Sequence, residues 1–269
     1  MSKGKVLVIG SNATRIEIQG GGTGPTGQYL NETVVPMLAL VDAGYEVLLA
    51  TPNGAKPYID PASDSAQHFA GDEAAYRRAK AFFADDPATN QGRTLRSVID
   101  EGLANYAAVF VPGGQAPVVD LMQDADAGEI LRHFHAHRKP TALLCHGPIV
   151  VAAAMAGARA FRTALIAGDR ARAAELAKGW QYAGYRMTVY SGSEEKPIED
   201  NILHGELYFN MPDALGTAGA QVTTGADFEP HVIVDRELIT GQNPRSDHQL
   251  AARLVHALDQ ARGRATAAA

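Results

Sequence analysis

The sequence contains a single cysteine, Cys145, among 269 residues. One thiol excludes an internal disulfide and any metal site built from several thiolates, so we expect a cytoplasmic protein whose fold needs no disulfide. No apolar run approaches the roughly 18 residues of a membrane span. The apolar run after Lys3 and Lys5 is also too short for the core of a signal peptide. These absences predict no membrane partner and no secretion signal.

The sequence also lacks an excess of basic residues. It carries 24 Lys and Arg residues against 30 Asp and Glu residues, a formal net charge of -6. Because nucleic-acid surfaces need clustered Lys and Arg, this balance argues against a nucleic-acid partner. With 46% hydrophobic and 20% charged residues, the composition is typical of a soluble globular protein. No change of composition divides the chain, so we predict one domain over residues 1–262 and a frayed tail over residues 263–269.

Short β-branched runs alternate with helical patterns along the whole chain. We predict strands at residues 5–9, 45–52, 107–114, 140–145 and 185–192 and two across a turn in 231–244, with helices at 29–43, 73–83, 126–137, after Gly147, 163–178 and 246–262. This alternation predicts an α/β fold with a mostly parallel sheet and helices on both faces. Ligands of such sheets bind outside the carboxyl ends of the strands. The candidate segments there are the Gly-rich loop with Glu32, residues 112–114, and Cys145 with His146.

The Gly-rich segment from Gly22 to Gly27 matches G-x-G-x-x-G, the fingerprint of dinucleotide binding. That fingerprint has to follow its strand directly, and here a dozen residues intervene after Ile9. The next strand ends at Thr51 and Pro52 without an acidic residue placed for a ribose. We therefore predict a flexible loop that borders the site, and no cofactor.

Two further patterns suggest sites but have simpler explanations. His133 and His137, with His135 between them, have a spacing on a predicted helix that can chelate zinc. No third ligand is near in the sequence and the neighbours are charged, so we predict an exposed helix and no metal. The Arg-rich stretch around Arg170 is explained in the same way, as a solvated helix face.

The only thiol lies where an apolar strand turns into a helix, in ALLCHGPIVVAAA, residues 142–154. A sharp strand-to-helix turn projects its residue into the cleft, which is the geometry of a nucleophile elbow. Unpaired N–H groups and the helix dipole are expected to favour the thiolate there. The alternative is a small cysteine that only packs in the core. The adjoining histidine and glycines favour the nucleophile.

Residues near Cys145 in the predicted fold complete a reactive site. Gly113 and Gly114 follow the neighbouring strand, where a backbone N–H could join an oxyanion hole. His146 is the adjoining base, and a carboxylate on its far nitrogen would orient it. Glu194 and Glu195 lie just beyond strand 185–192, and either could supply that carboxylate.

Several of these segments together resemble a known family. VFVPGG followed by LLCHGP resembles the DJ-1/PfpI superfamily. TGQYLNETVVPMLALVDAGYEVLLATPNG, DPASDS, NYAAVFVPGG and LITGQNPRSDHQLAARLV are similar to its larger members, the heat-shock chaperone and glyoxalase III branch. The resemblance implies a flavodoxin-like three-layer sandwich related to class I glutamine amidotransferases, and a homodimer.

The resemblance also implies a role for each matching residue. Cys145 matches the nucleophile and His146 its partner histidine. Glu32, in NETVVP, matches a glutamate that shares a proton with the sulfur. The third triad member is an acid one strand later, which the spacing places at Glu195, with Glu194 as the alternative.

The backbone of Gly114 and the N–H of His146 take the oxyanion role in this resemblance. Some chaperones of the branch have a metal-binding His in the turn after Pro-Gly-Gly, where this sequence has Gln115. We therefore expect no such metal site. A helix at about residues 163–180 is interpreted as an insertion that caps the cleft and changes the substrate size.

The resemblance implies an enzyme that converts small α-oxoaldehydes, such as methylglyoxal and glyoxal, to α-hydroxy acids without glutathione or a cofactor, or that repairs glycated groups. Two alternatives stay open. One is a stress-inducible holding chaperone, in which the thiol is a sensor or a bystander. The other is a hydrolase or hydratase of the same superfamily that acts on amides or isonitriles.

Overall fold

The structure is a computed structural model that describes residues 2–267. Its central sheet has seven strands, and β10 alone runs antiparallel to its neighbour, while the other neighbouring pairs are parallel. In spatial order the strands are β10 (Val232–Asp235), β11 (Leu238–Gly241), β7 (Thr141–Leu144), β6 (Tyr106–Val111), β1 (Lys5–Ile9), β4 (Glu46–Thr51) and β5 (Arg93–Thr94). The mostly parallel sheet that the sequence predicts is confirmed.

The central strands are buried on both faces because alternate side chains enter two different cores. In β1, Val6 and Val8 join a cluster with side chains of α1 and α9. Leu7 and Ile9 point to the opposite face and join a second, larger cluster. A continuous apolar run therefore forms this strand, without the polar alternation of a half-exposed one.

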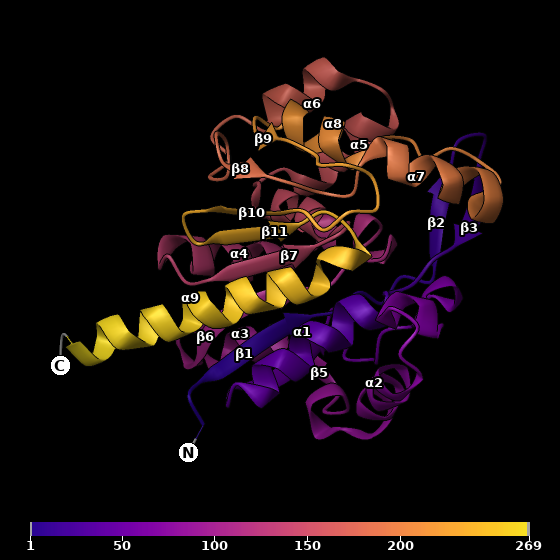
Figure 1. Cartoon of the computed structure of the whole chain (residues 1–269). Coiled ribbons are helices and arrows are strands. Elements are labelled where there is room, and N and C mark those ends of the chain that lie inside the picture. Colours follow the sequence, from indigo (N-terminus) through magenta and orange to yellow (C-terminus); the bar gives the residue numbers. More distant parts are fainter. Residues whose placement is uncertain (1, 268–269) are drawn as a thin grey trace.

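Helices cover both faces of the sheet (Figure 1). Helices α1 (Leu30–Asp42) and α9 (Asp247–Ala267) pack on one face, and α2 (Glu73–Asp85) packs against the outside of α1. Helices α3 (Leu95–Glu101) and α4 (Ala125–Ala136) lie on the other face. This arrangement confirms the three-layer α/β prediction.

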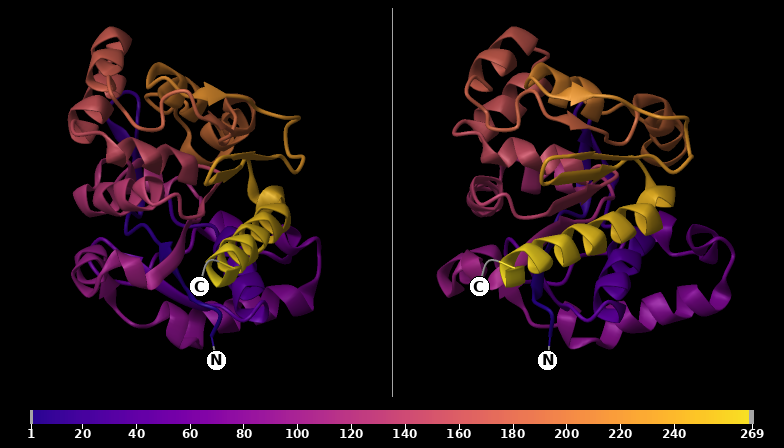
Figure 2. Two further views of the ribbon diagram at one scale, coloured as in Figure 1. Left: turned by 90° about the vertical axis from the view of Figure 1, so that its left-hand side faces the viewer. Right: turned by 60° about the vertical axis from the view of Figure 1, so that its left-hand side comes forward.

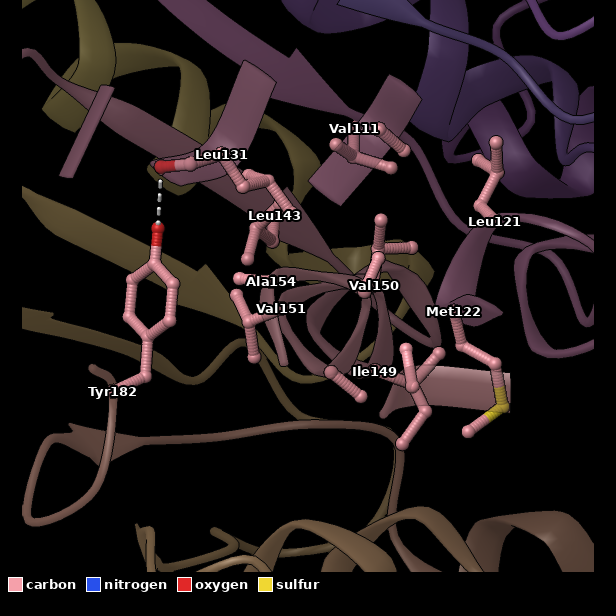
Figure 3. Close-up of a cluster of buried hydrophobic side chains, with 14 of the residues drawn as sticks. Val111, Leu121, Met122, Leu131, Leu143, Ile149, Val150, Val151, Ala154 and Tyr182 are labelled. Atoms are coloured by element: carbon pink, nitrogen blue, oxygen red, sulfur yellow. Dashed lines mark hydrogen bonds between the residues drawn. The ribbon is translucent and has the colours of Figure 1, made fainter. Parts of the chain in front are cut away.

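The helix that follows Cys145 is a 3₁₀ helix, η7 (Gly147–Ala154), and all of its side chains are buried. Figure 3 shows Ile149, Val150 and Val151 of this helix packed among side chains of β7 and α4. Tyr182 belongs to this cluster and donates its hydroxyl to the carbonyl of Leu131 at 3.2 Å. The elbow is therefore fixed in the centre of the core.

Residues 158–222 form a layer at the end of the molecule opposite the N-terminus (Figures 1 and 2). The single helix predicted at 163–178 is wrong, because the chain turns at Gly168 and Asp169, and Asp169 caps a second helix. The layer contains α5 (Ala158–Ile166), α6 (Arg170–Leu176), β8 (Arg186–Met187), α7 (Gly192–Ile198), a π-helical turn η8 (Glu199–Leu203), α8 (Met211–Thr217) and β9 (Gln221–Val222).

The strand predicted at 185–192 is shorter and lies outside the main sheet. Only Arg186–Met187 is a strand, and it pairs with β9. Beyond it the chain crosses the end of the sheet, where the N–H of Tyr190 donates to the carbonyl of Cys145 at 2.9 Å. This crossing brings residues 190–195 to the carboxyl end of β7.

The Gly-rich segment is a hairpin rather than a flexible loop. Strands β2 (Arg15–Ile18) and β3 (Gly22–Pro25) pair antiparallel. Gly22 and Gly24 of the dinucleotide-like motif thus lie in strand β3, and Gly27 lies just beyond it, before α1. The hairpin packs against η8, where Leu203 approaches Gly24 so closely that a side chain at 24 would collide with it.

Helix α9 extends to Ala267 and so continues through most of the tail that the sequence predicts as frayed; residues 268 and 269 lie outside the described part. None of the helices described over residues 2–267 is long and apolar enough to cross a membrane. Short 3₁₀ turns complete the structure at Pro61–Ser63, Ala66–Phe69, Pro87–Thr89, Leu103–Asn105, Ala116–Val118, Leu121–Gln123 and Pro244–Ser246.

Candidate active site

Cys145 occupies a sharp turn between β7 and η7. Its backbone has φ 60°, in the left-handed region that a residue with a side chain seldom adopts. The strained position is held by its N–H, which donates to the carbonyl of Gly241 at 2.8 Å, and by its own carbonyl, which accepts from Tyr190. Pro148 follows in the first turn of η7, where a missing N–H costs nothing. The nucleophile elbow expected from the sequence is present in geometry.

Two glycines after β6 allow the chain to approach this elbow. A Cβ at Gly113 would lie 2.2 Å from Glu32 Oε2 and 2.4 Å from the Cβ of Cys145. Gly114 has φ 82° and would collide with the carbonyl of Gly27 if it had a side chain. The N–H of Gly114 faces the Cys145 sulfur and lowers the pKa of the thiol. Only glycine can bring Glu32 and a backbone donor this close to the thiol.

A chain of hydrogen-bonding groups runs from the thiol to Glu195. Cys145 Sγ lies 3.3 Å from His146 Nδ1, and His146 Nε2 lies 2.6 Å from Glu195 Oε2. Because the carboxylate can only accept, Nε2 carries a proton, which leaves Nδ1 of a neutral ring as an acceptor toward the thiol. Gln115 donates its amide to the other oxygen, Glu195 Oε1, at 2.5 Å. Glu195 thus orients the imidazole of His146, and Gln115 in turn orients the carboxylate of Glu195.

The neighbouring acid, Glu194, is directed away from His146. Its two oxygens accept hydrogen bonds from Ser191, from the side chains of Gln242 and Asn243, and from the N–H of Phe228. Five donors on one buried carboxylate tie three segments of chain together. Of the two acids that the sequence left as alternatives, the structure brings Glu195 to the histidine.

Glu32 is fully buried in the first turn of α1, beside the thiol. Within residues 2–267 neither of its carboxyl oxygens has a well-formed hydrogen bond, although the Cys145 thiol and the N–H groups of Gly113 and Gly114 lie near enough to lower its pKa. Burial outweighs these contacts and raises the pKa of Glu32 to about 8. At neutral pH this carboxyl group therefore holds a proton that it can exchange.

Burial also raises the pKa of the Cys145 thiol well above its ordinary value, and the Glu32 carboxylate raises it further. The sequence predicts that the helix N-terminus favours the thiolate, but in the structure burial of the sulfur outweighs the nearby N–H of Gly114 and raises the pKa of the thiol. The raised pKa favours the protonated thiol over the thiolate. His146 Nδ1 is in position to accept the thiol proton.

The space above the thiol is very small. Its volume is about 10 Å³, roughly that needed for one water molecule. The Tyr190 ring lies on His146 with centroids 4.6 Å apart. The lining also includes Ile198 of α7, Ile202 of η8 and residues of several loops and turns: Tyr29, Asp60, Ala62, Gly114, Gln115 and Pro244.

A larger cavity of about 400 Å³ lies on the other side of α7. Gly192 and Glu195 of α7 and Glu199 of η8 line it, together with Tyr208 and Phe209 of the following loop. Arg170 and Asp213 lie at this cavity and pair with each other at 2.7 Å. Glu195 thus borders the large cavity while its carboxylate holds His146.

The metal and cofactor patterns of the sequence do not converge at this site. Across residues 2–267, no group of three or more His, Cys, Asp or Glu side chains is placed to hold a metal ion. The rings of His133 and His137 stack with centroids 4.1 Å apart. The side-chain amide of Gln115, in the turn after Pro-Gly-Gly, donates a hydrogen bond to Glu195.

The structure brings together the six residues proposed from the sequence: Cys145, His146, Glu32, Glu195, Gly113 and Gly114. Sequence reasoning missed Gln115 as a partner of Glu195, and it missed Tyr190 and the two isoleucines of the lining. Only the position of Gln115, directly after Pro-Gly-Gly at a strand end, was a usable signal.

The profile of the DJ-1/PfpI family matches residues 27–182, which include Glu32, Cys145 and His146. This chain belongs to the DJ-1/PfpI family. Over nearly its whole length the chain is also similar to the protein/nucleic acid deglycase HchA of Staphylococcus aureus (strain Newman). The two are 27% identical over 257 residues, which cover 92% of this chain and 77% of that protein.

Solved structures share the DJ-1/PfpI fold along almost the whole chain. Glyoxalase III from Candida albicans aligns with a TM-score of 0.70 at 17% identity and covers 95% of this chain and 97% of its own. The Rapid Encystment Protein 24 KDa of Francisella tularensis aligns with a TM-score of 0.71 at 20% identity, over 95% of this chain and 99% of its own. At these identities the likeness concerns the fold alone.

Proposed function

We propose that this protein is a glyoxalase- or deglycase-type enzyme that converts α-oxoaldehydes to α-hydroxy acids without glutathione, with Cys145 as its nucleophile. The hydrogen-bonded series Cys145, His146 and Glu195, with protonated Glu32 against the thiol, carries the proposal. The names of relatives in the family, a protein/nucleic acid deglycase and a glyoxalase III, agree with this chemistry.

The first step is addition of the thiol to the aldehyde. His146 Nδ1 removes the thiol proton as sulfur bonds to the aldehyde carbon, and the carbonyl π electrons move to oxygen. The N–H groups of Gly114 and His146 stabilise that oxyanion, which then takes a proton to give a hemithioacetal. Glu195 supports the imidazolium that forms in this step.

The second stage moves a proton between the two carbons. Neutral His146 removes the hydrogen from the carbon bonded to sulfur, which gives an enediol, and a proton returned to the adjacent carbon gives a 2-hydroxy thioester. Water then hydrolyses the thioester and restores the thiol. One carbon is oxidised and its neighbour is reduced, so the sum is addition of one water with no external electron carrier.

Incubation with methylglyoxal tests the proposal, with lactate measured as the product. We expect turnover by the wild-type protein and none above background for Cys145→Ala, a substitution of similar size in the buried elbow. Lactate formation at equal rates in both proteins, or in neither, contradicts the proposal.

Amide hydrolysis is a second candidate because a cysteine, histidine and glutamate series also suits acyl transfer. Release of ammonia from small primary amides, dependent on Cys145, would favour it over the oxoaldehyde reaction. Absence of release at saturating amide, in a preparation that forms lactate, rejects it.

A further inference from the structure

The thiol pocket restricts what can reach Cys145. Cys145 is 2% exposed, and the space of about 10 Å³ above it holds no organic molecule larger than a water. A substrate must therefore displace part of the lining before it can contact the sulfur. Which wall can move decides which substrates enter.

Several walls of the pocket are fixed by their own bonds. The Tyr190 ring stacks on His146, and its hydroxyl donates to the carbonyl of Glu194 at 3.2 Å. The amide of Gln115 is held by Glu195. Gly114 is pressed against the backbone of residues 27–29. Tyr190 and Gln115 hold His146 and Glu195 in place, and Gly114 places its N–H beside the sulfur, so movement of any of them would disturb the groups around the thiol.

Two isoleucines with no polar ties form another part of the lining, which also includes Tyr29, Asp60, Ala62 and Pro244. Ile198 ends α7 and is partly buried, and Ile202 lies four residues later in η8. Ile202 is 38% exposed, although it lines the pocket, so it separates the thiol from solvent. A β-branched side chain has few χ1 rotamers, so it can move only by changing from one rotamer to another. This wall can thus admit a small group and stop a large one.

We propose that Ile198 and Ile202 set the upper size of the substrate, so that the site takes free two- and three-carbon α-oxoaldehydes and excludes adducts on protein side chains or nucleobases. The inference rests on the proposed function and narrows its substrate class. The space of about 10 Å³ beside the thiol has no room for the polymer that carries such an adduct. Each isoleucine acts by contact with the substituent on the reacting carbonyl.

The first experiment compares methylglyoxal with phenylglyoxal, which carries the same reacting group and a larger substituent. We expect the wild-type kcat/KM for methylglyoxal to exceed that for phenylglyoxal by at least about tenfold. Ile198→Ala, Ile202→Ala and the double variant should shift this ratio toward phenylglyoxal, the double variant by about tenfold or more. The control Val41→Ala truncates an exposed side chain of α1 and should keep the wild-type ratio. An unchanged ratio in the double variant overturns the proposal.

The second experiment does not require turnover. Iodoacetamide and the bulkier iodoacetanilide both alkylate a free thiol, and Cys145 is the only cysteine. We expect the alanine variants to accelerate alkylation by iodoacetanilide selectively, whereas parallel acceleration of both reagents overturns the size limit. The alkylation rates can be measured even if the protein converts no oxoaldehyde. In that case the proposed function fails, and the size limit of the pocket is still tested. If the alanine variants do not fold, Ile198→Val and Ile202→Val test the same selectivity with a smaller shift.

Discussion

The two cavities on either side of α7 differ in almost every physical property. The thiol pocket has about 10 Å³, with walls of tyrosine, proline and isoleucine, whereas the cavity behind Glu195 has about 400 Å³ and a mixed polar lining. Cys145 and His146 face the smaller space. The larger cavity is lined by neither Cys145 nor His146, although Glu195 borders it. The difference shows that the sulfur is enclosed, with room for about one water molecule beside it.

Glu195 is the residue that belongs to both regions. Its carboxylate holds His146 on the thiol side and is held by Gln115, and the same residue borders the larger cavity. Substitutions at Glu195, at its supports and at the far rim of the large cavity therefore test how separate the two regions are.

The largest effect is expected for Glu195→Gln. An amide can accept only through its oxygen, so either His146 Nε2–H or the Gln115 amide then faces an NH₂ group. We expect kcat/KM for methylglyoxal to fall by about 10³-fold, as the loss of an oriented base predicts. Steady-state kinetics on folded protein, checked by circular dichroism, measures it. A loss below tenfold would mean that the two regions are not joined through Glu195.

Glu32→Gln is expected to lower kcat/KM by about 10²-fold, because an amide cannot exchange a proton with the thiol. It should also change how stability depends on pH. The pKa of Glu32 rises from 4.5 to about 8 on folding, so the folded state binds the proton more tightly. The stability this contributes is complete below about pH 4.5 and is lost as pH rises through about 8.

Urea unfolding of the wild type and Glu32→Gln at pH 5, 7 and 9 measures this dependence. The free energy of unfolding of the wild type should decline relative to that of the variant by a few kcal/mol across this range. Parallel pH curves for the two proteins would show that Glu32 titrates with an ordinary pKa in the folded state.

Gln115→Leu removes a donor without adding charge. Glu195 Oε1 would lose its buried partner while the bond to His146 stays, so we expect about a tenfold loss in kcat, the size of one lost hydrogen bond to a charged group. Gln115→Glu provides the comparison, since a second carboxylate against Glu195 should lower activity further. Activity of Gln115→Leu equal to the wild type would remove Gln115 from the site.

The smallest effect is expected for Asp213→Asn, at the far side of the large cavity. The pair with Arg170 is largely exposed and is worth little in water. We expect kcat to be unchanged and the Tm to shift by less than about 2 °C. A drop in kcat of tenfold would show that the large cavity takes part in the reaction, and the contrast between the two regions would not hold.

The parts predicted well are those with local signals. The strand before Cys145 and the glycines on both sides of the elbow follow from a short apolar run and residues that allow tight turns. The hairpin at residues 15–25 was missed because its turn and its second strand hold Gly20, Gly21, Gly22 and Gly24, a composition typical of a loop, although β2 carries Ile16 and Ile18. The helix at 163–178 was predicted in one piece because alanine and arginine favour helix on both sides of Gly168.

The sequence by itself determined that parallel strands would carry Cys145, His146 and Glu32 to one edge, because backbone pattern and turn chemistry act over a few residues. Only the tertiary structure decided that Glu195 and not Glu194 meets the histidine. It also placed the amide of Gln115, 80 residues earlier in the chain, against Glu195, and two isoleucines in the lining of the thiol pocket. These contacts depend on how α7 is placed against the sheet. That placement is set by packing and hydrogen bonds between distant segments, which no local pattern encodes.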